Sequence, residues 1–167
     1  MTPKQRYNEA HKVYQCAKTP SVCRDGHYSA PKYPDTRKAN GLTTFCINYL
    51  IWTGNHGERT NTMGRPIQKY APKFNIMTGT VVQVEAGIEW QKGTGTKGSS
   101  DIKGHINVNY QRFAVPIYIE IKIRDKQSSE QVEYQRKINN TGGLYVIVHN
   151  PEEFMKFYDD VVNNYIL

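Results

Sequence analysis

The chain has 167 residues, of which 38% are apolar, and 22 Lys and Arg against 15 Asp and Glu give it a formal net charge of +7. This length and composition fit one domain with its own core, and the positive charge favours a polyanionic partner, because neutralised phosphates release their counterions. No apolar run reaches the roughly 18 residues of a membrane span and no signal-peptide core opens the chain, so we expect an intracellular protein without a membrane segment.

Residues 1–39 differ in character from the rest and are predicted to be a basic N-terminal extension. A short helix is indicated from Pro3 to Gln15, and Pro20, Pro31 and Pro34 then prevent regular structure. The extension either packs on the domain or lies along nucleic acid, and we expect it to take no part in chemistry.

Three cysteines leave one thiol unpaired in any disulfide scheme, which favours a reducing compartment. His11, Cys16, Cys23 and His27 are residue types that zinc accepts, but six residues separate the two cysteines, and zinc ribbons do not use that spacing. We therefore predict no structural zinc and keep it only as an alternative. Cys46 lies in an apolar stretch and is expected in the core.

A helix is predicted over residues 40–54. Its apolar residues recur at steps of three and four, and Gly54 provides a stop. They are Leu42, Phe45, Cys46, Tyr49, Leu50 and Trp52.

A short strand is predicted next, over Glu58 to Thr62, with Arg59 and Asn61 on the same side. Residues 64–78 are rich in basic, proline and aromatic residues with weak periodicity, which predicts an insertion loop or an irregular hairpin. Residues 80–84 are predicted to form a further strand.

A glycine-rich approach runs from residue 89 to the segment Gly98-Ser99-Ser100-Asp101. It lacks the spacing of a Walker phosphate-binding loop, so we interpret it as a flexible lead into the next strand. Lys92 and Lys97 are expected to meet a phosphate backbone from this segment. The Gly-Ser-Ser turn delivers Asp101 to the start of a strand over residues 101–106.

A second strand, over residues 116–124, alternates strictly between apolar and polar side chains, and residues 107–114 are expected to connect the two. Its apolar face carries Ile117, Ile119, Ile121 and Ile123; its polar face carries Tyr118, Glu120, Lys122 and Arg124. If the two strands are neighbours, Asp101 and Glu120 meet.

Two carboxylates beside a lysine form a hard oxygen site for a divalent cation, with an ammonium group to steady a phosphate or a hydroxide. Phosphodiester hydrolysis needs this combination. The alternative for Glu120 and Lys122 is a solvated sheet face with a weak ion pair, and for Asp101 a turn or helix-cap role.

A helix is predicted to begin at Ser128, a good N-cap, with Gln131, Gln135 and Ile138 along one edge that can face the site. Gly142-Gly143 ends it. A buried strand follows over residues 144–148, and Pro151 opens a last helix. Its expected core residues are Phe154, Phe157, Tyr158, Val161 and Val162.

These motifs together resemble the PD-(D/E)XK nuclease superfamily. Gly98-Ser99-Ser100-Asp101 and Glu120-Ile121-Lys122 match its signature, with Ser100 in place of the usual proline. The Ser-x-x-Gln helix start at Ser128 and the Gly-Gly strand from Gly142 are similar to the VRR-NUC branch. The resemblance covers roughly residues 40 to 160.

The resemblance implies an α/β fold with a restriction-endonuclease-like core over residues 40–167. In it a mixed β-sheet is flanked by helices in the order α-β-β-β-α-β-α. Asp101, Glu120, Lys122 and Gln131 would be catalytic, and Asp101, Glu120 and the carbonyl of Ile121 would hold Mg²⁺ or Mn²⁺. Family members usually have a glutamate near the start of the first helix, where this chain has Asn40 and Thr43.

The implied activity is metal-dependent cleavage of DNA, by a cytoplasmic or phage-encoded protein in a bacterial host. The expected DNA-binding residues are Arg59, Asn61, Lys92, Lys97, Lys103 and Arg124. Stand-alone relatives tend to act as homodimers on branched DNA, which suggests Holliday junctions or flaps as substrates. Two alternatives stay open: a non-catalytic DNA-binding module on a degenerate nuclease fold, and an RNA-directed enzyme of the same fold.

Overall fold

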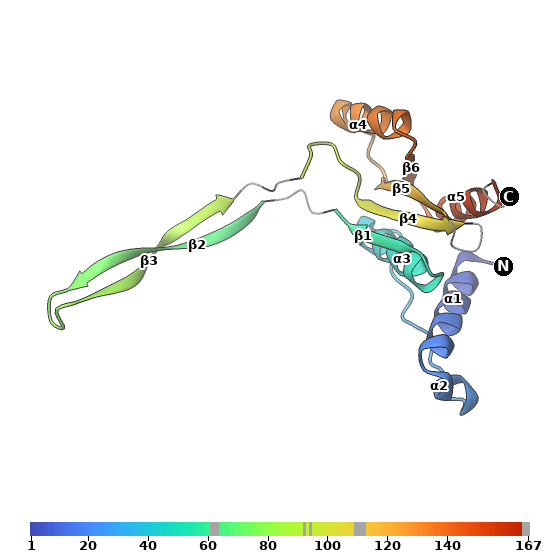
Figure 1. The fold of residues 1–167 in the computed structure, drawn as a ribbon, viewed down its shortest axis with the longest axis horizontal. Helices are drawn as coiled ribbons and strands as arrows, with labels where there is room; N and C mark the ends of the chain where they lie inside the picture. Colours follow the sequence, from blue (N-terminus) through green and yellow to red (C-terminus); the bar gives the residue numbers. More distant parts are fainter. Residues whose placement is uncertain (61–63, 92, 94, 109–112, 165–167) are drawn as a thin grey trace. The chain divides into compact units, whose positions relative to one another are not determined.

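The computed structural model describes residues 1–60, 64–91, 93, 95–108 and 113–164. Over these described residues three helices are followed by five strands and then by a helix, a strand and a last helix (Figure 1). Two compact units are present: one comprises the residues up to Thr60 and from Gly98 onwards, and the other is the segment between them. Among the helices of the described residues, none has both the length and the apolar character that crossing a membrane requires.

The elements of the larger unit begin with two helices, α1 and α2, followed by an α-β-β-β-α-β-α series. This series has the predicted order. In chain order they are α1 (Pro3–Lys18), α2 (Pro20–Arg24), α3 (Ala39–Trp52), β1 (His56–Arg59), β4 (Ile102–Val108), β5 (Phe113–Ile121), α4 (Ser129–Asn140), β6 (Leu144–Val148) and α5 (Pro151–Asn164).

Four strands of the larger unit form a mixed sheet in the order β1-β4-β5-β6. The β1–β4 and β4–β5 pairs are antiparallel, and the β5–β6 pair is parallel. The predicted strands that carry Asp101 and Glu120 are therefore neighbours. This chain is a mixed α/β protein in which β5, the strand of the Glu-x-Lys motif, lies inside the sheet.

The apolar face of β5 is buried as its alternation predicts, but the strand spans Phe113–Ile121 and not residues 116–124, so Ile123 lies beyond it and is only partly buried. Ile117 and Ile119 are fully buried and Ile121 is 5% exposed. They share one core with apolar residues of α3 and α5, which lie on this side of the sheet (Figure 1). The core includes Leu42, Phe45, Cys46, Leu50, Ile102, Ile106, Val148, Phe154 and Val161.

The other face of the sheet is covered by α4 (Figure 1). Tyr134 of α4 packs against Tyr118 of β5 and Tyr145 of β6, with ring centroids 6.2 and 6.3 Å apart. Because of this cover, Glu120 is only 2% exposed. The alternative of a solvated polar face is therefore wrong at Glu120.

Residues 1–39 pack on the domain, which is one of the two outcomes expected for them. Tyr7 of α1 is fully buried and stacks on Phe45 of α3, with ring centroids 5.0 Å apart. Arg6 forms an ion pair with Asp159 of α5 at 2.6 Å, and this contact raises the pKa of the guanidinium. Part of the proline-rich stretch is also helical, since Pro20 opens α2 at a position where its missing N–H is tolerated.

The expectation of reduced thiols is wrong for two of the three cysteines. Cys16 at the end of α1 and Cys23 of α2 form a disulfide, so their sulfurs are not thiolate ligands. His11 instead contacts Tyr28 and Gln15. Among the described residues, no group of three or more His, Cys, Asp or Glu side chains is arranged to hold a metal. The spacing of seven residues could not reveal that a helix end and a short helix bring the two cysteines together.

The smaller unit is a hairpin of two long antiparallel strands, β2 (Arg65–Asn75) and β3 (Thr80–Gln91), with one register shift between Lys69 and Tyr70. Of the two alternatives for residues 64–78, the hairpin is the one found. Its strands are longer and more regular than expected. Periodicity was weak here because neither face of the hairpin is buried, so no alternation of apolar and polar residues is required.

The substitution Tyr7→Ala tests whether α1 belongs to the core. The lost aromatic packing should lower the free energy of unfolding by about 3–5 kcal/mol, measured by urea denaturation. Val13→Ala on the same helix is the control, because Val13 is 59% exposed and should cost less than about 0.5 kcal/mol. Equal small losses for both variants would show that α1 does not share the core.

Candidate active site

Asp101 and Glu120 lie at the same end of two paired strands. Ile102 of β4 is opposite Ile119 of β5, so the residues that precede and follow this pair, Asp101 and Glu120, come next in the ladder. The side chain of Asp101 is anchored there, because its Oδ2 accepts a hydrogen bond from the backbone N–H of Ile121 at 2.9 Å. The pairing on which the sequence prediction depended is therefore present.

The turn before Asp101 is held by contacts with two other segments. Gly98 has φ +79°, and a Cβ at this position would lie 2.6 Å from the carbonyl oxygen of Glu130 in α4. The buried hydroxyl of Ser100 donates to the carbonyl of Ile102 at 3.1 Å. The backbone N–H of Thr60 donates to the carbonyl of Asp101 at 2.8 Å. The Gly-Ser-Ser turn thus fits tightly between α4 and the sheet.

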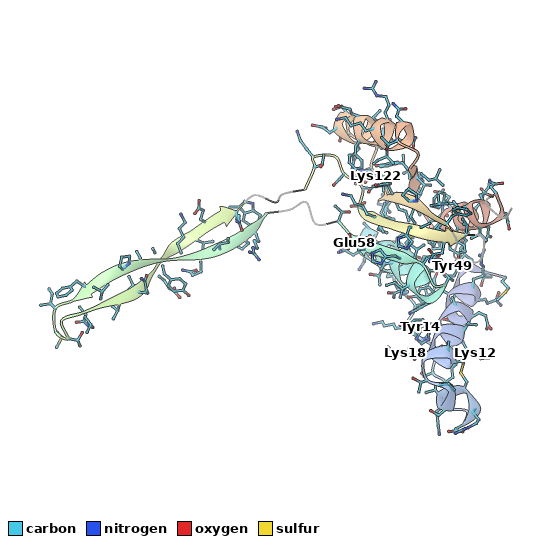
Figure 2. All side chains as sticks on the ribbon, in the orientation of Figure 1. Lys12, Tyr14, Lys18, Tyr49, Glu58 and Lys122 are labelled. Atoms are coloured by element: carbon cyan, nitrogen blue, oxygen red, sulfur yellow. A yellow bond between two sulfur atoms is a disulfide. The ribbon has the colours of Figure 1, made fainter. Side chains whose placement is uncertain are left out.

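Glu120 has one partnered and one unpartnered carboxylate oxygen. Its Oε1 accepts from the ammonium of Lys122 at 3.2 Å and from the side-chain amide of Gln131. Its Oε2 is buried and has no hydrogen-bond partner among the described residues. Figure 2 shows Lys122 on the side of the sheet that α4 covers. A buried carboxylate oxygen without a partner is costly, so it marks a place where a ligand would be stabilising.

The start of α4 orients the amide of Gln131. Ser128 is the N-cap, and its hydroxyl accepts from the backbone N–H of Gln131 at 3.3 Å. In return, Oε1 of Gln131 accepts from the backbone N–H of Ser128 at 2.9 Å. This capping box leaves Nε2 of Gln131 to donate to Glu120, so one side chain both caps the helix and holds the carboxylate.

Burial raises the pKa of Glu120, and the charge of Asp101 raises it further, while Lys122 lowers it. Tyr145 of β6 is affected in the same way: burial raises the pKa of its phenol, and the charge of Glu120 adds to the shift. Tyr145 was not predicted as part of the site. Its phenol stands in an otherwise apolar strand, and this was the only available signal.

The residues present fit a divalent cation. Asp101 and Glu120 supply two carboxylates, and the orphan Oε2 of Glu120 needs a positive partner. A cation would also relieve the repulsion that raises the pKa of Glu120. Further ligands would have to be carbonyls or water, since no third acidic or histidine side chain completes a cluster in the described residues. The carbonyl of Ile121 stays the predicted third ligand.

The first helix of the series offers no acid to this site. Thr43 is buried, and its hydroxyl donates to the carbonyl of Ala39 within α3. The side-chain oxygen of Asn40 accepts from the guanidinium of Arg59 at 2.5 Å. Arg59, a predicted DNA contact, is thus exposed at the end of β1 and tied to the start of α3.

Two further predicted DNA contacts, Lys103 and Arg124, belong to β4 and to the segment after β5. Lys103 of β4 lies on the sheet face that α4 covers, with its ammonium 5.9 Å from the ring centroid of Tyr134. Arg124 is exposed just beyond β5.

The three remaining predicted contacts do not belong to the described part of the larger unit. Lys97 is exposed and belongs to the smaller unit. Asn61 and Lys92 lie outside the described residues. Their assignment therefore stays a prediction from the sequence.

Comparison of the chain with protein-family models, with curated proteins and with solved structures finds no match. Asp101, Glu120, Lys122 and Gln131 form the candidate site of this chain.

Gly98→Ala tests the close approach of the Asp101 turn to α4. Gly142→Ala is a matched control, because Gly142 also has a positive φ, +84°, but a Cβ there would meet nothing within 4 Å. In both variants an alanine in the left-handed backbone conformation should lower the free energy of unfolding by about 1–2 kcal/mol. Gly98→Ala should lose at least about 1 kcal/mol more in urea unfolding, because its Cβ meets helix backbone. Equal losses would show that the turn is not packed on α4.

Proposed function

We propose that this protein is a divalent-metal-dependent endonuclease that hydrolyses phosphodiester bonds in DNA. The α-β-β-β-α-β-α series would then be a restriction-endonuclease-like core of the VRR-NUC type. One observation carries the proposal: a carboxylate buried inside a sheet, with one oxygen unpartnered, next to a second carboxylate and a lysine. A purely structural ion pair has no need of the second acid or of the orphan oxygen.

In this proposal Asp101, Glu120 and the carbonyl of Ile121 hold Mg²⁺ or Mn²⁺. Such an ion supplies Lewis-acid chemistry, neutralising phosphate charge and acidifying water. Asp101 and Glu120 can serve as fixed ligands because each is already positioned, Asp101 by the N–H of Ile121 and Glu120 by Gln131.

Lys122 would act on the reacting phosphate. One of its three N–H donors points to Oε1 of Glu120, 3.2 Å away, and the other two can hold the attacking water and a phosphate oxygen. Water would lose a proton to solvent as its oxygen forms a bond to phosphorus, the bond to the leaving oxygen would break, and that oxygen would take up a proton from solvent. The side chain of Lys122 is 15% exposed, so its charge acts in a partly desolvated place where it is stronger than in water.

A non-catalytic DNA-binding module remains the competing function. The observation that favours it is the first helix, where Thr43 bonds its own helix and Asn40 bonds Arg59. Two acids and a lysine are nevertheless present together, which a decayed site has no reason to keep. The two functions differ in one outcome, cleavage in the presence of Mg²⁺ or Mn²⁺.

Metal binding is tested by thermal unfolding with increasing Mn²⁺ or Mg²⁺. At about 100 times the dissociation constant the ion should stabilise the protein by about 2.7 kcal/mol, which raises the Tm by about 5–10 °C for a chain of this size. Glu120→Gln should abolish this rise. Glu133→Gln should preserve it, because Glu133 is an exposed acid of α4 paired with Lys137. A rise that survives in Glu120→Gln would place the ion elsewhere.

Catalysis is tested with labelled linear, flap and four-way-junction DNA, with and without Mn²⁺. Asp101→Asn and Glu120→Gln should each reduce the cleavage rate by on the order of 10³-fold or more, because several kcal/mol of transition-state stabilisation are lost. Lys122→Met should reduce the rate by about 10²-fold with little change in DNA affinity. Lys126→Met is the control, since Lys126 is an exposed lysine of the same loop.

Undiminished cutting by both acid variants would refute the assignment of the site. Binding of DNA by the wild-type protein without cleavage in either metal would favour the non-catalytic module. Loss of binding, rather than of rate, in Lys122→Met would make that lysine a phosphate clamp.

A further inference from the structure

The hairpin formed by β2 and β3 has an unusual amount of exposed apolar surface. None of its described residues is buried. Two-stranded hairpins are only marginally stable in water, and large apolar side chains on them usually mark a binding surface. The exposed large apolar residues of this hairpin are Tyr70, Phe74, Ile76, Met77, Val81, Val82, Val84, Ile88 and Trp90.

The strand register separates the aromatic rings from the positive charges. Residues opposite each other in an antiparallel pair share a face, and successive residues alternate between faces. Pro66 is opposite Trp90, and Tyr70 and Phe74 follow on the same face of β2. This aromatic face consists of Pro66, Gln68, Tyr70, Pro72, Phe74, Val81, Gln83, Glu85, Ile88 and Trp90. The opposite, basic face carries Arg65, Lys69 and Lys73.

Rings and cations repeat at the same interval. One ring lies at every fourth position along β2: Trp90 of β3 lies opposite Pro66, and Tyr70 and Phe74 follow in β2 itself. At the rise of an extended strand, successive rings are about 13 Å apart. The cations occupy positions 65, 69 and 73, each one residue before a ring position. At the 3.4 Å rise of a stacked nucleic-acid strand, each interval spans about four bases.

We propose that the β2–β3 hairpin binds single-stranded DNA, with bases stacked on Tyr70, Phe74 and Trp90 and phosphates neutralised by the cations of β2. Aromatic platforms beside basic side chains are the usual means of binding single strands without sequence preference. The three rings are each 60% exposed, so their faces are accessible to bases. The choice of DNA over RNA rests on the proposed function.

The basic side chains can reach a strand that lies on the aromatic face. Among the strands of the described residues, β2 pairs with β3 alone, so none of these strands covers its other edge and long side chains can pass around it. Lys69 has an ion pair with Glu89, but both side chains are more than half exposed, so the pair is weak and a phosphate can replace the carboxylate. Glu85 is the one charged residue of the aromatic face.

The test measures binding of an oligothymidylate to the full chain in EDTA, so that it is independent of metal and cleavage. Trp90 should be quenched by stacking, whereas Trp52 packs on Tyr7 in the larger unit and should not respond. Tyr70→Leu with Phe74→Leu removes the rings and keeps apolar side chains. Affinity by fluorescence anisotropy should fall about 5- to 150-fold for each ring.

Val82→Ala with Val84→Ala is the matched control, because these exposed side chains lie on the basic face. It should leave the affinity unchanged, and Lys73→Gln should reduce the dependence of affinity on salt. Blunt duplex DNA should bind more weakly, since its bases are not free to stack. The proposal is overturned by equal duplex binding, by unchanged affinity in the leucine variant, or by sedimentation showing a dimer that the leucine variant does not form. These outcomes are distinct from failure of the nuclease assignment, which shows only when metal is added.

Discussion

A carboxylate removed from water is the constraint around which the larger unit is built. Glu120 is 2% exposed, and an ionised group is buried only where other groups compensate for the lost hydration. Lys122 and Gln131 do so for one oxygen. That arrangement requires α4 to lie over the sheet and to begin at Ser128, so that the helix cap and the carboxylate share one amide. The turn that leads to Asp101 packs against the same end of α4, so closely that position 98 has no space for a Cβ atom.

Much of this arrangement could be predicted from the sequence because its signals are local. The two-residue alternation of β5 identified its buried face, and the N-cap at Ser128 fixed where α4 begins. The Asp turn and the Glu-x-Lys strand indicated that Asp101 and Glu120 would meet if their two strands were neighbours, and these strands are paired. The first two inferences need only the conformational preferences of a few adjacent residues, whereas the pairing of the two strands is a contact between distant segments.

Other features depend on contacts between distant segments, and no local pattern reports them. The burial of Glu120 arises from the cover that α4 provides, and the approach of Tyr145 arises from the parallel β5–β6 pairing. The place of Tyr7 in the core and the Cys16–Cys23 disulfide depend on how the first two helices pack. The hairpin of β2 and β3 was hard to recognise because no residue of either strand is buried, so its sequence shows no regular alternation of apolar and polar residues.

The alternation of β5 also bears on how this protein can evolve. At Ile117 and Ile119, on the buried face, any apolar side chain of suitable volume can pack in the core. Substitutions among valine, leucine and isoleucine should therefore be frequent at these positions. On the other side, Lys122 and Gln131 both contact Oε1 of Glu120, so almost no other side chain could replace this glutamate. The two faces of one strand therefore accept different ranges of residue types, several apolar ones toward the core and very few toward α4. In an alignment of relatives, variable and invariant positions would alternate along this strand.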